Sequence, residues 1–284
     1  MTLELHATPE DVMRAVEAWR EFARSRRISE EITFGLALSL EECGSNVVNH
    51  ALKRDARQTF RVTFERVADG IFIELRDRGP EFDPTAVPEP GSERNLDDFP
   101  GGWGLHLVRR YTDEFCYRRQ AGENILRLGR RLTPANGGTK IQQSEPDQSK
   151  PKRKTDMPLE IQMQQSIGTQ NTGGVTVKLA GSLDTATAPD LERQLAPVLG
   201  GPVKDIVFDL ERLKFISSAG LRVFSATRKT LKERGGQASF VKMQPQIQEV
   251  FEIIKSLPGV AIFKDEAELD RYLAVRQRSH EHNK

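Results

Sequence analysis

The chain has 284 residues, of which 37% are hydrophobic and 29% charged, and its 42 Lys and Arg against 41 Asp and Glu leave a formal net charge of +1. This composition is typical of a globular protein of two domains, and the charge balance gives no reason to expect direct nucleic-acid contact. The chain has no run of about 18 apolar residues to predict a membrane span, and it has only two cysteines. The charged first residues do not predict a signal peptide. We therefore expect a cytoplasmic protein without membrane contact, whose Cys43 and Cys116 are buried free thiols.

The first 132 residues predict helices packed on one face of a mixed or antiparallel sheet. Thr8 and Ser29 are candidate N-caps for two helices that run to about Arg24 and Leu52. Alternating apolar residues and turn residues predict the other elements: a short strand at 3–5, strands at 58–67 and 70–77, a loop at 79–101, a helix at 103–111, and strands at 113–120 and 124–132.

Residues 134–158 contain Pro, Gly, Ser, Gln and charges with almost no large apolar side chain. Such a segment predicts a flexible linker with a root-mean-square reach of roughly 25–30 Å. Its basic cluster at 150–154 is interpreted as solvated charge. We therefore expect one domain at 1–133, a second at 159–276, and a tail at 277–284.

The second domain alternates strands and helices, which predicts an α/β domain with parallel strand pairs. Strands are expected at 159–167, 173–181, 203–210, 237–243 and 260–263. Helices are expected at 187–199, 218–234, 246–256 and 265–276. A short loop is expected between Leu210 and Phe215.

Three motifs in the first domain could together form a nucleotide site. Glu42, Asn46 and Asn49 stand at i, i+4 and i+7 of a helix and should project from one face, beside an apolar stripe. Asp77 ends a strand two residues before Gly79, where a carboxylate can accept hydrogen bonds from an amino-purine edge. Glycines at 101–104 open a helix, whose N-terminal amides suit phosphate. Each motif alone is equally compatible with a solvated helix face, an ordinary turn or a simple loop.

In this order and spacing, E-x-x-x-N, D-x-G-x-x-F-D and G-x-G-L resemble the GHKL ATPase superfamily, in particular the anti-sigma factor serine kinases of bacterial partner switching. The resemblance covers nearly all of residues 1–132 and implies a Bergerat-type α/β sandwich that binds ATP and Mg²⁺. It implies that Glu42 is the general base, that Asn46 holds Mg²⁺ and that Asp77 binds the adenine amino group. The other implied nucleotide contacts are Asn49, Gly79, Gly102, Gly104 and Leu105. Glu81 departs from the pattern, because the superfamily often has glycine there.

Ser217 and Ser218 stand at the start of an expected helix, where an N-cap alone would explain them. Together with GSLDTATAPDLERQL at 181–195, however, ISSAGLR resembles the STAS domain of anti-sigma factor antagonists, over about 159–276. This resemblance implies phosphorylation of a serine shortly before the Gly-Leu pair, best matched by Ser218, at a helix start that accommodates phosphate. It also implies that Asp184 and Asp209 lie near that serine. Ser217 and Ala219 depart from the pattern, because many phosphorylated members have Asp and then two hydroxyl residues before the Gly-Leu pair.

Two functions follow from these resemblances. In the first, the chain is an Mg-ATP-dependent protein serine kinase that acts on an antagonist-type STAS domain in cis or in trans, including its own Ser218, and controls sequestration of a sigma factor or similar regulator. In the second, it is a catalytically weak, ATP-gated binding module whose STAS domain competes for the regulator-binding surface. Glu42 favours the kinase, because a pure binder needs no base, whereas Ser217 in place of Asp and Glu81 in place of Gly favour the binding module. The family's kinases also suggest a homodimer.

Overall fold

The structure is a computed structural model that describes residues 1–88, 102–132, 159–166, 174–254, 261–264, 267–269 and 271. Contacts divide the chain into two compact units, Met1–Val87 with Val108–Met157, and Pro88–Leu107 with Pro158–Lys284. The expected linker at 134–158, the tail at 277–284 and most of the helix expected at 265–276 lie outside the described residues.

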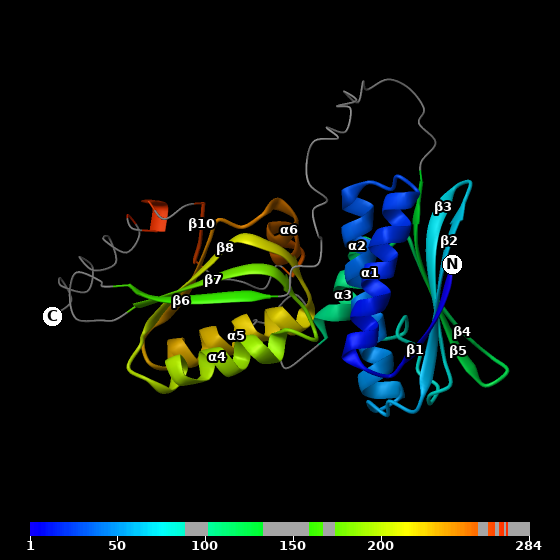
Figure 1. Ribbon diagram of the computed structural model, residues 1–284, viewed down its shortest axis with the longest axis horizontal. Coiled ribbons are helices and arrows are strands. Elements are labelled where there is room, and N and C mark those ends of the chain that lie inside the picture. The colour runs from blue at the N-terminus through cyan, green and yellow to red at the C-terminus, as the bar shows by residue number, and fades with distance from the viewer. Residues whose placement is uncertain are drawn as a thin grey trace, which may run out of the picture. The chain divides into compact units, whose positions relative to one another are not determined.

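The first unit is a five-stranded antiparallel sheet in the order β1-β2-β3-β5-β4, with α1 and α2 side by side on one face (Figure 1). Its strands are β1 (Thr2–His6), β2 (Thr59–Val67), β3 (Gly70–Asp77), β4 (Glu114–Gln120) and β5 (Glu123–Arg131). Its helices are α1 (Pro9–Ser25), α2 (Glu30–Asn46) and the π-helix η1 (Val47–Ala51). The helix α3 (Trp103–Tyr111) precedes β4, and the division between the units falls within it, after Leu107. This arrangement confirms the expected helices on one face of a sheet.

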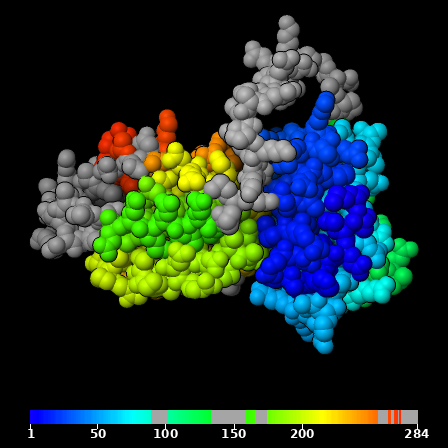
Figure 2. All heavy atoms as spheres, in the orientation of Figure 1, coloured from blue at the N-terminus to red at the C-terminus, as the bar shows by residue number. Residues whose placement is uncertain are grey.

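Hydroxyl caps start both long helices where the sequence predicts them. Thr8 Oγ1 accepts a hydrogen bond from Asp11 N at 3.2 Å, and Ser29 Oγ accepts one from Ile32 N at 3.3 Å. Trp19 of α1 is fully buried and meets Phe64 of β2 edge-on, with 5.6 Å between ring centroids. In the space-filling view, the dark blue atoms of β1 and α1 form a continuous part of this unit's surface (Figure 2).

The second unit is a mixed sheet in the order β10-β9-β8-β7-β6. Its strands are β6 (Glu160–Ser166), β7 (Gly174–Leu183), β8 (Asp205–Ile216), β9 (Gln237–Val241) and β10 (Ala261–Phe263), and its helices are α4 (Ala188–Gly200), α5 (Ser218–Glu233) and α6 (Pro245–Ile254). β7, β8, β9 and β10 pair in parallel, as expected, and β6 pairs antiparallel with β7. α4 and α5 lie side by side along the sheet (Figure 1). Phe208 stacks on Phe240 in the core, with 5.3 Å between centroids.

Two expectations are wrong. The expected loop after Leu210 is part of β8, in which the buried Leu213 and Phe215 alternate with the exposed Arg212 and Lys214. Cys116 is exposed, because it lies on the outward side of the edge strand β4, whereas Cys43 is buried. Among the helices that the structure describes, none is both long enough and apolar enough to cross a membrane.

Candidate functional site

Glu42 and Asn46 lie one turn apart at the C-terminal end of α2. Glu42 is only 5% exposed although it carries a carboxylate, and Asn46 is partly buried. The apolar stripe beside them is buried as predicted: Leu36, Leu40, Cys43 and Val47. Burial, and after it the charge of Glu42, raises the pKa of the Cys43 thiol above its usual range. A carboxylate removed from water beside a polar amide is a candidate for catalysis rather than for solubility.

The helix continues beyond Asn46 with a different geometry. Residues Val47–Ala51 form the π-helix η1, in which Leu52 N donates to Val47 O at 2.8 Å. The i, i+7 alignment predicted for Asn49 assumed α-helical spacing, and this spacing holds only as far as Asn46. The Asn49 side-chain oxygen accepts a hydrogen bond from Arg54 Nε at 2.6 Å. The role of Asn49 at a nucleotide therefore stays a prediction.

Asp77 ends β3 with its carboxylate almost fully buried, at 7% exposure. Its Oδ1 accepts hydrogen bonds from Gly79 N at 2.8 Å and from Asn124 Nδ2 at 2.9 Å. A Cβ on residue 79 would lie 2.7 Å from the Ala51 Cβ and 2.9 Å from the Asp77 Oδ1, so only glycine fits there. The Asp-x-Gly turn thus packs against the end of η1, and the structure brings the first two motifs together.

Asn124 is a buried residue of this site that the sequence analysis did not identify. It lies opposite Asp77 in the pairing of β3 with β5. Its Nδ2 also donates to Pro80 O at 3.0 Å, and its Oδ1 accepts from Tyr117 Oη at 2.8 Å and from Arg119 Nη1 at 2.6 Å. Only the strand register could have revealed it, because a lone asparagine near the start of a strand carries no signal.

The third motif begins α3. Gly102 has a φ of 104°, a left-handed conformation that favours glycine, and Gly104 and Leu105 lie in the first turn of the helix. Arg109, further along α3, donates to three backbone oxygens of the loop that follows Asp83: those of Pro84, Thr85 and Val87. These bonds attach α3 to the loop after the Asp-x-Gly turn.

Glu81, the departure from the superfamily pattern, points away from the buried network. Its side chain is 69% exposed and lies 4.0 Å from the guanidinium of Arg119. Arg119 also donates to Gly79 O at 3.2 Å. The glutamate is therefore an exposed ion-pair partner of Arg119.

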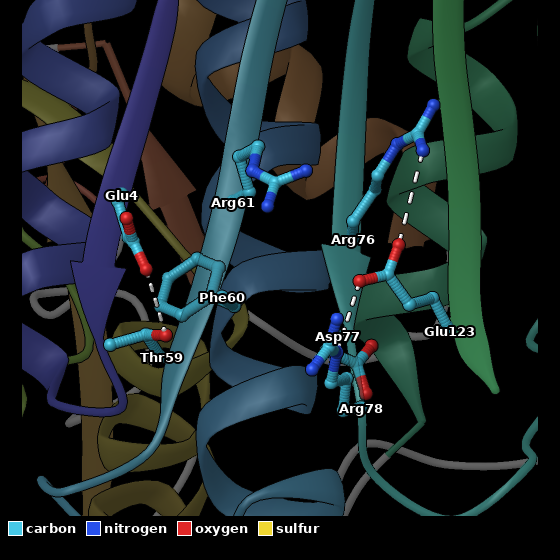
Figure 3. Close-up of a pocket in the computed structure, with 8 residues that line it drawn as sticks. All are labelled: Glu4, Thr59, Phe60, Arg61, Arg76, Asp77, Arg78 and Glu123. Carbon is cyan, nitrogen blue, oxygen red and sulfur yellow. Dashed lines mark hydrogen bonds and ion pairs between the residues drawn. The ribbon is translucent and has the colours of Figure 1, made fainter. Parts of the chain in front are cut away.

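A cleft of about 190 Å³ opens at the end of β3 (Figure 3). Its lining is mostly charged: Glu4, Thr59, Phe60, Arg61, Arg76, Asp77, Arg78 and Glu123. Glu123 pairs with Arg78 at 3.1 Å and with Arg76 at 3.9 Å. Arg76 alternates with the buried Leu75 and so faces away from the helices. The lining shares Asp77 with the predicted nucleotide site but does not include Glu42 or Asn46.

Ser217 and Ser218 differ sharply in exposure at the start of α5. Ser217 is 1% exposed, its N donates to Leu183 O at 3.0 Å, and its Oγ has no hydrogen-bond partner among the described residues. Ser218 is the first helical residue and is partly exposed. A Cβ on residue 220 would lie 2.6 Å from the Leu183 Cγ, so Gly220 allows α5 to approach the end of β7. Of the two hydroxyls, Ser218 is the more accessible.

The two acidic residues expected near the serine lie in different places. Asp184 directly follows Leu183, and its Oδ1 accepts from Ala186 N at 2.9 Å and Thr187 N at 3.0 Å, which shapes the turn into α4. Asp209 lies opposite Lys178, whereas Leu183 lies opposite Ile216, seven residues further along β8. The expectation for Asp209 is wrong, and its carboxylate instead pairs with Lys242 Nζ at 3.2 Å.

Comparison with known families finds two matches, each to a different part of the chain. The histidine kinase-like ATPase domain family matches residues 5–130, and the STAS domain family matches residues 161–269. The chain is similar to the serine/threonine-protein kinase BtrW of Bordetella bronchiseptica, with 31% identity over 134 residues that make up 47% of this chain and 94% of the relative.

The chain is also similar to two antagonists. The putative anti-sigma factor antagonist BtrV of Bordetella bronchiseptica is 40% identical over 75 residues, which are 26% of this chain and 65% of that relative. The anti-sigma-B factor antagonist of Staphylococcus aureus is 34% identical over 77 residues, which are 27% of this chain and 71% of that relative. The chain therefore belongs to the bacterial partner-switching family, as a fusion of a GHKL-type, histidine kinase-like ATPase domain with a STAS domain.

Proposed function

We propose that this chain is an Mg-ATP-dependent protein serine kinase whose substrate is an antagonist-type STAS domain, with its own Ser218 as one acceptor. Phosphorylation would control the sequestration of a sigma factor or a similar regulator. The observation that carries the proposal is the buried carboxylate of Glu42 one turn before Asn46, in a chain that also holds a partly exposed serine at the start of a STAS helix. Similarity to a protein named as a serine/threonine kinase supports it.

The side chains at the site suit a metal that is bound mainly through a nucleotide. Among the residues that the structure describes, no cluster of three or more His, Cys, Asp or Glu could hold a metal ion by itself. Asn46 offers one amide oxygen, which is a suitable single protein ligand when phosphate oxygens and waters complete the Mg²⁺ shell. ATP, when bound, supplies the transferred phosphoryl group. Asp77 would accept a hydrogen bond from the adenine amino group. The N-terminal amides of α3, with Gly102, Gly104 and Leu105, would face the phosphates.

Glu42 would act as the general base in phosphoryl transfer. The serine Oγ forms a bond to the γ-phosphorus, the bond from that phosphorus to the ADP oxygen breaks, and the hydroxyl proton passes to the Glu42 carboxylate. The reaction therefore needs only one proton acceptor from the protein.

Ser218 is the better acceptor because Ser217 is buried. A phosphate on the first residue of α5 would meet unpaired helix amides and a favourable dipole, so the helix could keep its fold. It would add about −1.5 to −2 charges to the surface around the start of α5. This charge is the signal that would release or recruit a regulator.

The test is intact-mass and phosphopeptide spectrometry after incubation of the full chain with Mg·ATP. We expect one phosphate at Ser218, absent from Glu42→Ala and Ser218→Ala and retained by the matched control Ser217→Ala. Mixing isotopically labelled Glu42→Ala with Ser218→Ala distinguishes the routes, because a phosphate on the labelled chain requires transfer between chains.

One outcome contradicts the kinase. If the wild type binds ATP but phosphorylates neither itself nor a separate antagonist-type STAS domain, the chain is the ATP-gated binding module of the second hypothesis. Chromatography with light scattering in the same experiment measures whether the chain forms a homodimer.

A further inference from the structure

Asn124 connects Asp77 to two hydrogen-bond donors on β4. Tyr117 Oη and Arg119 Nη1 both donate to the Asn124 Oδ1, at 2.8 and 2.6 Å. Because two donors converge on one end of the amide, its NH₂ end must face the other way, toward Asp77. The amide orientation is thus set by the chemistry of its neighbours.

This arrangement directs two hydrogen bonds to the same oxygen of the Asp77 carboxylate. Asn124 Nδ2 and Gly79 N both donate to Oδ1, at 2.9 and 2.8 Å. Two donors on one oxygen fix the plane of the carboxylate. Since an ionised carboxylate offers about four lone-pair sites, Oδ2 keeps its capacity to accept from a ligand. Asp77 and Asn124 are 7% and 6% exposed, so water competes little for these bonds.

Asn124 also stands between Asp77 and a cation. The guanidinium of Arg119 donates to the Asn124 Oδ1, and the Nδ2 of the same amide donates to the Asp77 Oδ1. Without the asparagine side chain, Arg119 would be free to pair with the Asp77 carboxylate directly. A charge-assisted bond of that kind would occupy the acceptor sites that a ligand needs.

We propose that Asn124 is a positioning residue that fixes Asp77 for the recognition of a 6-amino purine and so sets the base selectivity of the site. This inference rests on the nucleotide binding proposed above. A 6-keto purine presents an oxygen where adenine presents an amino group. Against a carboxylate that cannot rotate, two acceptors face each other and repel, whereas a carboxylate free to turn tolerates both bases.

The experiment compares the dissociation constants of Mg·ATP and Mg·ITP by calorimetry, because inosine differs from adenine by a keto group in place of the amino group. We expect the wild type to prefer ATP. Asn124→Ala should weaken ATP binding about tenfold and ITP binding less than about twofold, since only ATP uses the fixed acceptor. In the phosphorylation reaction, KM for ATP should rise while kcat changes little.

Two further variants make the result interpretable. Asn124→Leu fills a similar volume without polar atoms and should reduce the ATP preference in the same way if Asn124→Ala does not fold. The control Ser25→Ala removes a side-chain hydrogen bond of 2.7 Å to Phe22 O at the end of α1, and it should leave the ATP:ITP ratio unchanged.

The outcomes separate this inference from the function on which it rests. A folded Asn124 variant with the wild-type ATP:ITP ratio overturns the positioning role and leaves the kinase proposal standing. A wild type that binds no ATP overturns both. A fall in the ratio for Ser25→Ala as large as for Asn124→Ala also refutes the positioning role, because selectivity would then follow general stability.

Discussion

Gly220 offers a direct test of how α5 is seated on the sheet of the second unit. Replacing a helical glycine by alanine ordinarily stabilises a helix by up to about 1 kcal/mol. At this position, however, the new Cβ would lie 2.6 Å from the Leu183 Cγ and 2.9 Å from the Leu183 backbone oxygen. The leucine side chain could rotate, but the backbone oxygen of a paired strand cannot move alone. Overpacking of this kind costs about 1–3 kcal/mol, so we expect Gly220→Ala to destabilise the unit by about 1–2 kcal/mol.

The assay is amide hydrogen exchange in increasing urea, read at the peptides of α5, because this signal reports the second unit alone. Gly200→Ala is the matched control, since nothing lies within 4 Å of a Cβ built at the end of α4. That substitution should be neutral or stabilising by less than about 1 kcal/mol. If Gly220→Ala stabilised α5 as much as Gly200→Ala stabilises α4, the close approach of α5 to β7 would be refuted.

Three other predictions follow from the structure. Asp184→Ala should destabilise the second unit by about 1–2 kcal/mol, because the turn before α4 loses its carboxylate acceptor. Asp184→Asn keeps an acceptor oxygen and should cost less. Equal losses of stability for the two variants in urea unfolding would contradict this account. In the folded protein at pH 8, a thiol reagent should modify Cys116 and leave Cys43 intact, because burial raises the pKa of Cys43 and keeps its thiol protonated. If both thiols of the native chain were labelled, α2 would have to open readily. Hydrogen bonds from Arg57 lower the pKa of Asp55 to about 2, so Arg57→Ala should return this pKa toward 3.8 in a carboxyl NMR titration. A lowered pKa stabilises the fold at pH values above 3.8, and this stabilisation is lost as the pH falls toward 2. Because the pair is at the surface, we expect no measurable change in the free energy of unfolding.

Local signals were enough to predict most of the secondary structure. Thr8 and Ser29 cap the helices they were expected to cap, since a hydroxyl before an acidic first turn has one favourable role. The continuation of β8 was missed because its exposed Glu211, Arg212 and Lys214 break the apolar run. Cys116 was misassigned because periodicity along one strand does not say which strand is at the sheet edge.

The sequence predicts candidate site residues only where they lie in a short motif. Glu42, Asn46 and Asp77 are visible as residue types at fixed spacing. Asn124 is identified by its pairing with Asp77 on the neighbouring strand, and Arg109 by its hydrogen bonds to a loop about 25 residues earlier. Neither contact can be predicted without the tertiary structure. The π-helical turn before Leu52 has no sequence signature that we recognise.

β3 and β5 are neighbours in the sheet, held in register from Gly70 opposite Arg131 to Asp77 opposite Asn124, yet the chain between Asp77 and Asn124 includes α3, β4 and every residue of the third motif. Closing such an excursion costs entropy only in proportion to the logarithm of its length, about 0.6 kcal/mol for each doubling. Insertions between Val87 and Gly102 would therefore leave the sheet almost as stable as before. In evolutionary terms, a fold of this kind can acquire new partners by varying one segment while the two strands that hold Asp77 and Asn124 opposite each other stay the same.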